Sequence, residues 1–166
     1  EKFVHEKLNL DPISLYNKTK MCSERIVLSF KNEMNVKIIR PATVCGYSPR
    51  MRFDVSVNAL TSSAFLNKKI IVQGGDQIRP NIHIDDLTDL YLYFLEKKIK
   101  DTIFNAGFEN LSIKKIAKTV QKHVHSEIIF QKNILDPRSY RLDSSKLLKT
   151  GFKPKKKVED AIQELH

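Results

Sequence analysis

The sequence predicts an α/β fold built on a parallel sheet. Segments with the four-residue apolar spacing of helices alternate with short apolar runs of strand length along the 166 residues. This alternation is typical of parallel strands joined by helical crossovers. The alternation is not interrupted by repeats, low-complexity segments or a clear linker, so we expect one continuous α/β body.

The first predicted helix runs from about residue 15 to residue 31. Cys22, Ile26 and Phe30 step by four along the face that we expect to be buried. The run VKIIRPATVCG (36–46) follows as one buried strand, because it is too short for a core helix. The segment before the helix, residues 1–12, is expected to be a polar loop.

The rest of the chain continues the same alternation. After a loop over residues 47–53, we expect helices at about 55–67, 87–95, 113–124 and 158–165, and strands at 69–73, 81–84, 102–106 and 127–131. The turn Gly74-Gly75-Asp76 closes the strand 69–73. Asp85 and Asp86 are expected to cap one of these helices and Ser112 another.

Composition excludes several classes of protein. No apolar stretch approaches the ~20 residues of a membrane span, and the net charge of +10 lacks the interleaved aromatics or Gly-rich loops of nucleic-acid modules. Such a charge suggests an anionic partner of another kind. Cys22 and Cys45 have no metal-ligand spacing, so we expect a reduced, cytoplasmic setting and no metal site.

The pair Tyr16-x-x-x-Lys20 is the most informative motif for chemistry. Helical spacing places residues four apart on one face. An ammonium about 4 Å from a phenolate stabilises it by up to ~4 kcal/mol at an effective dielectric near 20, so such a pair can exchange protons near neutral pH. The alternative is a surface Tyr beside a surface Lys. A second match, Tyr93 with Lys97, is interpreted as structural because it closes an apolar helix.

Three further segments accompany Tyr16 and Lys20 in order and spacing: RPATVCG (40–46), VQGGDQIRPNIHIDD (72–86) and DPRSYRLDSSKLLKTGFKP (136–154). Together they resemble the C-terminal half of the extended short-chain dehydrogenase/reductases, in the NAD-dependent epimerase/dehydratase branch that acts on nucleotide sugars. The implied fold is the C-terminal half of a Rossmann-type doubly wound parallel sheet with a smaller mixed α/β substrate-binding region. Residues 1–46 would end the dinucleotide-binding domain. Residues 47–166 would form the substrate-binding region, interleaved with the last Rossmann elements.

The resemblance also implies roles for the residues that face the cofactor. Tyr16 would be the acid/base that exchanges a proton with the sugar, and Lys20 would assist it and bind the nicotinamide ribose. Pro41, Ala42 and Thr43 would end the strand where the backbone meets the nicotinamide, and Thr43 could also contact the substrate. The implied cofactor is NAD, with NADP as the alternative.

On the substrate side, the resemblance implies that Asn58, Arg79 and Arg138 bind the diphosphate of the nucleotide sugar. A guanidinium forks onto two phosphate oxygens, which an ammonium cannot do. The alternatives are a helix cap for Asn58 and surface ion pairs for the two arginines.

The residues upstream of such a half are not found. The sequence has no Gly-x-x-Gly-x-x-Gly after a strand, which in the resembled enzymes cradles the dinucleotide pyrophosphate. The resemblance implies that the Ser or Thr of the catalytic trio also lies upstream, outside this chain. Since the chain begins with Glu, we expect the N-terminal half to lie outside it. A homodimer is implied by the resemblance alone.

The predicted function is that of a nucleotide-sugar epimerase or dehydratase, in which a hydride moves from sugar to cofactor and back. One alternative is an NAD(P)H-dependent reductase of a keto-sugar or another carbonyl compound. A second is a non-catalytic dinucleotide sensor or scaffold, against which the intact Tyr16 and Lys20 argue.

Overall fold

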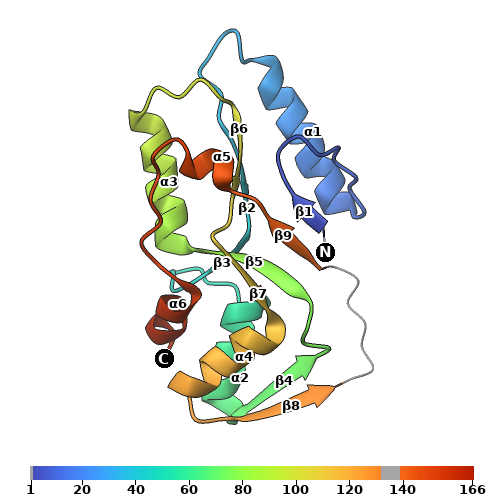
Figure 1. The fold of residues 1–166 in the computed structure, drawn as a ribbon, viewed down its shortest axis with the longest axis vertical. Helices are drawn as coiled ribbons and strands as arrows, with labels where there is room; N and C mark the ends of the chain where they lie inside the picture. Colours follow the sequence, from blue (N-terminus) through green and yellow to red (C-terminus); the bar gives the residue numbers. More distant parts are fainter. Residues whose placement is uncertain (1, 132–138) are drawn as a thin grey trace.

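The computed structural model describes residues 2–131 and 139–166 as a mixed α/β molecule (Figure 1). Its helices are α1 (Leu15–Ser29), α2 (Ser56–Asn67), α3 (Ile84–Glu96), α4 (Ile113–His123), α5 (Ser145–Leu148) and α6 (Val158–Glu164). Its strands are β1 (Lys2–Val4), β2 (Ile38–Pro41), β3 (Thr43–Cys45), β4 (Lys69–Gln73), β5 (Ile78–His83), β6 (Ile103–Ala106), β7 (Glu109–Ser112), β8 (Glu127–Gln131) and β9 (Tyr140–Leu142). Among these helices, none has the length and apolar character that crossing a bilayer requires.

The strands form small sheets that are mostly parallel. The pairs β1–β9, β2–β6, β3–β5 and β4–β8 are parallel, and only β5–β7 is antiparallel among the described strands. Each parallel pair joins strands far apart in sequence, as crossover connections require. The predicted α/β class with parallel pairing is therefore confirmed.

Two hydrophobic cores lie on either side of the central strands. One packs α2, α4 and α6 against β3 and β4, with Val57, Ile70, Val72, Ile116, Val120 and Ile162 fully buried. The other packs α3 and α5 against β2, β5 and β6, with Leu90, Phe94, Phe104 and Leu147 at its centre. Figure 1 shows these groups at opposite ends of the long axis of the molecule. The segment from β2 to β3 passes between them.

The predicted strand 36–46 is divided in two at Ala42. Its first part, β2, pairs with β6, and its second part, β3, pairs with β5. Gly107 lies so close to this break that a Cβ at Gly107 would come within 2.5 Å of the Cβ of Ala42. The chain can change partners here because the facing residue has no side chain.

The prediction of the buried face of α1 is wrong. Cys22, Ile26 and Phe30 are exposed, and no residue of α1 is buried. The half-buried side chains are those of Met21, Glu24 and Leu28, which form a different stripe. The ion pair between Glu24 and Arg40 joins this stripe to β2. The four-residue apolar spacing does mark a helix, but none of the described elements covers its apolar face.

Several short elements depart from the sequence prediction. Strand β1 lies within the expected polar loop, and β7, β9 and α5 were not anticipated. Strand β5 begins at Ile78, three residues before the predicted start. Pro80 is tolerated inside it because the pairing with β3 starts only at Asn81.

The caps of α3 and α4 test two predictions. Ser112 caps α4 as expected, since its side chain accepts a hydrogen bond from the Lys115 backbone. The N-cap of α3 is His83 and not Asp85 or Asp86, which lie in its first turn. Asp86 is buried, and its carboxylate accepts hydrogen bonds from the backbone N–H groups that precede α6.

Candidate active site

Two adjoining cavities lie where β2 and β3 end. Cavity 1 has a volume of about 540 Å³ and is lined by residues of α1, the β2–β3 segment, the loop 46–55, α3 and β9. Cavity 2 has a volume of about 410 Å³ and is lined by residues of α2, β4, β5 and the start of α4. Thr43 and Val55 belong to both linings, so the two cavities meet at these residues.

Tyr16 and Lys20 are brought together beside cavity 1. Ser14 caps α1 by accepting a hydrogen bond from the Asn17 backbone at 3.1 Å, which fixes Tyr16 in the first turn. Tyr16 lines cavity 1 with a residue exposure of 67%, so its phenol is accessible to a ligand. The Lys20 Nζ lies 5.6 Å from the centroid of the Tyr16 ring, within the range of a cation–π contact.

Pro41, Ala42 and Thr43 line cavity 1 together with Tyr16, at the point where the strand pairing changes between β2 and β3. The Ala42 backbone N–H donates to the Ala106 carbonyl at 2.7 Å, which fixes this part of the lining to β6. The structure therefore gathers all five residues predicted to face the cofactor around one cavity or directly beside it.

Asn58 is buried beneath the loop that covers cavity 1. Its Oδ1 accepts a hydrogen bond from the Gly46 backbone at 3.3 Å, and its Nδ2 donates to the Arg52 carbonyl at 3.0 Å. Both ends of the amide thus hold the loop 46–52 in place. Asn58 also lines cavity 1. The predicted contact between Asn58 and a diphosphate stays a prediction.

Arg79 lies on β5 and lines cavity 2, half-buried, with Nη1 donating to the Ile78 carbonyl at 3.3 Å. Thr43 lines the same cavity. The predicted contact between Arg79 and a diphosphate stays a prediction. Arg138, the second predicted arginine, lies outside the described residues.

The sequence prediction missed the loop between β3 and α2 as part of the site. Ser48, Arg50, Met51 and Arg52 all line cavity 1. The Arg52 guanidinium donates two hydrogen bonds to Asp54, at 2.9 and 2.6 Å. This pair raises the pKa of Arg52 and lowers that of Asp54. The density of arginines after a strand end was the signal available in the sequence.

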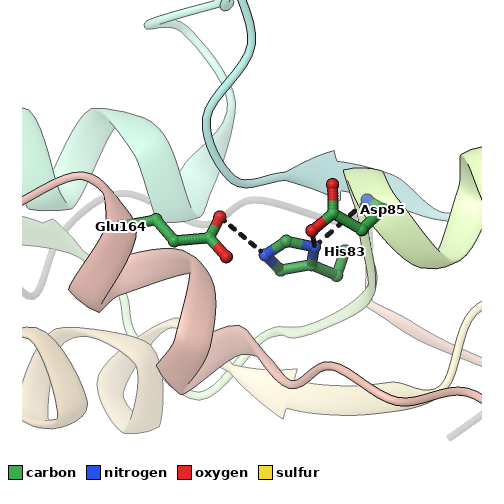
Figure 2. A group of neighbouring side chains, drawn as sticks. All are labelled: His83, Asp85 and Glu164. Atoms are coloured by element: carbon green, nitrogen blue, oxygen red, sulfur yellow. Dashed lines mark hydrogen bonds and ion pairs between the residues drawn. The ribbon is translucent and has the colours of Figure 1, made fainter.

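His83, Asp85 and Glu164 gather behind this loop (Figure 2). The His83 Nδ1 accepts a hydrogen bond from the Asp85 backbone at 3.1 Å, so the hydrogen of the neutral ring lies on Nε2, which faces Glu164 Oε2 at 3.0 Å. The two carboxylates lie on different sides of the ring (Figure 2). One ligand atom from each residue lies within 4.8 Å of the others, but both nitrogens of the imidazole are already engaged, Nδ1 by the Asp85 backbone and Nε2 by Glu164. This group is therefore better explained as a structural link.

Glu164 connects α6 to this link. Burial alone would raise the pKa of Glu164, but the hydrogen bond from Lys156 and the neighbouring His83 together hold it below its ordinary value. The Lys156 Nζ lies 2.9 Å from Glu164 Oε1. Gly46 packs over His83, since a Cβ at Gly46 would come within 3.0 Å of Nε2. The link therefore supports the loop that lines cavity 1.

Comparison with models of known protein families identifies the family of this chain. The model of the NAD dependent epimerase/dehydratase family matches residues 1–107. The chain belongs to this family. The resemblance seen in the sequence is thereby confirmed, and so is the expected Rossmann-type fold.

Members of the epimerase/dehydratase family with known names share modest identity with this chain. The GDP-6-deoxy-D-talose 4-dehydrogenase of Aggregatibacter actinomycetemcomitans is 27% identical over 106 residues, which are 63% of this chain and 35% of that protein. The chain therefore spans about a third of the length of this relative.

Two solved structures have the same fold. The UDP-glucuronic acid 4-epimerase of Bacillus cereus, in complex with UDP-glucuronic acid and NAD, is 27% identical with a TM-score of 0.81. The match covers 99% of this chain and 55% of that protein. RMD from Pseudomonas aeruginosa, complexed with NADPH, is 19% identical with a TM-score of 0.84, over 98% of this chain and 58% of RMD. At that identity, RMD supports the fold alone.

Proposed function

We propose that this chain forms the substrate side of an NAD-dependent enzyme that epimerises or dehydrates a nucleotide-diphosphate sugar. The observation that carries the proposal is the line of residues along the two adjoining cavities. Tyr16 lies in cavity 1, Thr43 at the junction and Arg79 in cavity 2. A sugar beside Tyr16 would thus place its diphosphate toward the arginine. The family and the UDP-glucuronic acid epimerase structure support the substrate class.

The residues around cavity 1 fit a nicotinamide cofactor. Tyr16 offers a phenol in cavity 1, and Pro41–Thr43 offer a stretch of backbone in the same lining. Lys20 adds an ammonium group beside the Tyr16 ring. NAD and NADP present the same nicotinamide to such a set, so it suits both. When bound, the cofactor would accept a hydride from a sugar carbon and return it.

The residues of the chain would supply positioning and proton transfer. Tyr16 would take the proton from a sugar hydroxyl as that carbon is oxidised and give it back on reduction. Lys20 would stabilise the phenolate through its charge. Thr43 lines both cavities, and its backbone is held by the pairing of β3 with β5. It would hydrogen-bond the sugar or its phosphate. Loss of water, in a dehydratase, would follow the oxidation.

A titration of the chain with nucleotide sugars tests the substrate class. UDP-glucose and GDP-mannose added to isotope-labelled protein should shift the backbone amide resonances of Thr43, Val55 and Arg79. Arg79→Met should weaken binding about 10- to 100-fold, the range for a charge-assisted hydrogen bond. Arg25→Met, an equal change of charge on the exposed surface of α1, should leave the affinity unchanged. Shifts confined to other surfaces would refute the proposal.

We also propose that two copies pair through α1. Its exposed apolar side chains include Ile26, Val27 and Phe30, and contiguous exposed apolar side chains often mark an interaction surface. Sedimentation velocity should show a dimer that Ile26→Glu converts to monomer. A monomeric wild-type protein at micromolar concentration would contradict this pairing.

A further inference from the structure

The charged side chains that line cavity 1 are all positive, which the reaction alone does not explain. Arg50 and Arg52 are the charged residues among those of the described chain that line it, and no acidic residue lines it. Neither sugar hydroxyls nor a nicotinamide ring, which is cationic when oxidised and neutral when reduced, require two guanidinium groups. We propose that Arg50 selects a nucleotide sugar whose sugar ring carries a carboxylate, a uronic acid; the inference rests on the function proposed above.

The two arginines differ in what they already bind. The guanidinium of Arg52 is occupied by the two carboxylate oxygens of Asp54, at 2.9 and 2.6 Å. Arg50 makes no hydrogen bond or ion pair with any residue in the described ranges 2–131 and 139–166. None of its five N–H donors is thus used by a residue that the structure describes. In this loop Asp54 pairs with Arg52, whereas Arg50 has no acidic partner among the described residues and is exposed beside the cavity.

The position of Arg50 separates a carboxylate on the sugar from the diphosphate. Arg50 shares cavity 1 with Tyr16, where the reacting sugar would lie, whereas the proposed diphosphate ligand Arg79 lines cavity 2. The two linings share only Thr43 and Val55 among the described residues. An anionic group that binds Arg50 would therefore belong to the sugar ring of the ligand and not to its diphosphate.

The chemistry of the guanidinium favours a carboxylate at this point. Its planar fork matches two carboxylate oxygens, while a hydroxymethyl group offers one neutral oxygen. The hydrogen bonds that hold the loop 46–52 also favour binding of a carboxylate by Arg50. Asn58 fixes the loop through Gly46 and the Arg52 carbonyl, so the residues on either side of Arg50 are held in place while its side chain stays exposed. Arg50 is thus a specificity residue by position and by chemistry.

Equilibrium binding of three ligands tests this inference on the purified protein. Free UDP reports the nucleotide and diphosphate, UDP-glucose adds a neutral sugar, and UDP-glucuronic acid adds the carboxylate. Wild-type protein should bind UDP-glucuronic acid about 10- to 100-fold more tightly than UDP-glucose, the range of a charge-assisted hydrogen-bonded pair. Arg50→Met should abolish this preference without changing the affinity for UDP. Arg25→Met, with the same loss of charge outside both linings, should keep the preference.

The possible outcomes separate this inference from the proposed function. Equal wild-type affinity for the two sugar nucleotides would overturn the role of Arg50 and leave the nucleotide-sugar function standing. An equal loss for all three ligands in Arg50→Met would assign Arg50 to the diphosphate and also overturn the inference. Failure of wild-type protein to bind any of the three would overturn the proposed function itself. Arg50→Lys, which keeps the charge without the fork, should retain part of the preference.

Discussion

At the scale of single residues, the two cysteines illustrate how burial sets reactivity. Cys45 is 1% exposed on β3, and burial, followed by the charges of Glu109 and Glu164, raises the pKa of its thiol to about 12. Its thiol therefore stays protonated throughout the neutral and mildly alkaline range. Cys22 lies exposed on α1. Because the thiolate is the nucleophile, only the exposed cysteine is open to rapid modification.

We therefore expect the folded protein, in its monomeric Ile26→Glu form, to react quickly with one equivalent of a thiol reagent. The second equivalent should react only after unfolding, and raising the pH from 7 to 9 should not change that count. Cys22→Ser should remove the fast phase, and Cys45→Ala should leave it intact. Two fast thiols in this folded protein would show that Cys45 is accessible.

Single residues of the site could be named from the sequence where a motif fixes them. Tyr16, Thr43 and Arg79 each follow a recognisable pattern, and the structure brings them to the same pair of cavities. The contacts of Asn58 could not be foreseen, because its partners are backbone groups whose positions depend on the shape of a loop. The place of Arg50 beside cavity 1 likewise depends on the shape of this loop, although the density of arginines after the strand end was a signal in the sequence.

At the scale of elements, the change of partner between β2 and β3 forms the wall of cavity 1. The close approach of Gly107 to Ala42 makes this change possible. A Cβ at Gly107 would lie 2.5 Å from that of Ala42 and 3.0 Å from Leu142 Cδ2. The wall of the site is therefore sensitive to a single added methyl group at Gly107, directly after β6.

Gly107→Ala should lower the free energy of unfolding by about 1–3 kcal/mol, as expected for overpacking in a core. The double variant Ala42→Gly/Gly107→Ala removes the closest clash and should recover much of this loss, measured by urea denaturation at equilibrium. Ala42→Gly alone is the matched control. A Gly107→Ala variant as stable as wild type would show that β2 and β6 are less tightly packed than the structure indicates.

The helix α6 depends on an acidic residue for part of its attachment. Glu164 bonds to Lys156 and His83, and its pKa in the folded protein is lowered from 4.5. A carboxyl whose pKa is lower when folded contributes stability above its unfolded pKa. That contribution is lost as the pH falls through the folded value.

Glu164→Gln should therefore reduce stability at pH 7 by about 0.5–1 kcal/mol, the range for a partly exposed ion pair. The difference between wild type and variant should be constant from pH 7 to pH 6 and should shrink below the unfolded pKa of 4.5. Thermal unfolding followed across this pH range provides the measurement. A difference that grows in acid would contradict the sign of the shift.

The longer elements were predictable because each has a clear period and a clear end. The helices α2, α3 and α4 and the strands β4 and β8 begin and end within a few residues of expectation. Strands β7 and β9 were missed because they are only four and three residues long and form through pairing with distant partners. Local composition cannot reveal such pairing.

At the scale of the whole molecule, two cores flank the segment that carries the site. The cores of α2, α4 and α6 and of α3 and α5 each include buried residues of the central strands. The cavities open between these cores, where the strands end, as ligand sites in α/β sheets generally do. The one large departure from expectation is α1, whose apolar stripe meets none of the described elements.

The helix α1 shows what apolar periodicity in a sequence can and cannot predict. The period identified the helix and placed Tyr16 and Lys20 on it, but it could not say which stripe packs inward. The stripe that contacts β2 contains Glu24, which binds Arg40, a polar contact that an apolar pattern does not mark. The exposed stripe is instead available for the proposed pairing of two copies.

The most direct test of the central claim is nucleotide-sugar turnover by the purified protein at its natural length, with NAD supplied and sugar products followed by NMR. Wild type should convert UDP-glucuronic acid to a new sugar nucleotide without net reduction of NAD, and Tyr16→Phe should slow conversion by at least about 100-fold. Tyr93→Phe is the matched control. Tyr93 belongs to the second Tyr-x-x-x-Lys match and donates to the Thr150 carbonyl at 2.7 Å, so this variant should lose stability but keep turnover. Equal turnover by wild type and Tyr16→Phe would contradict the assignment of Tyr16 as the acid/base.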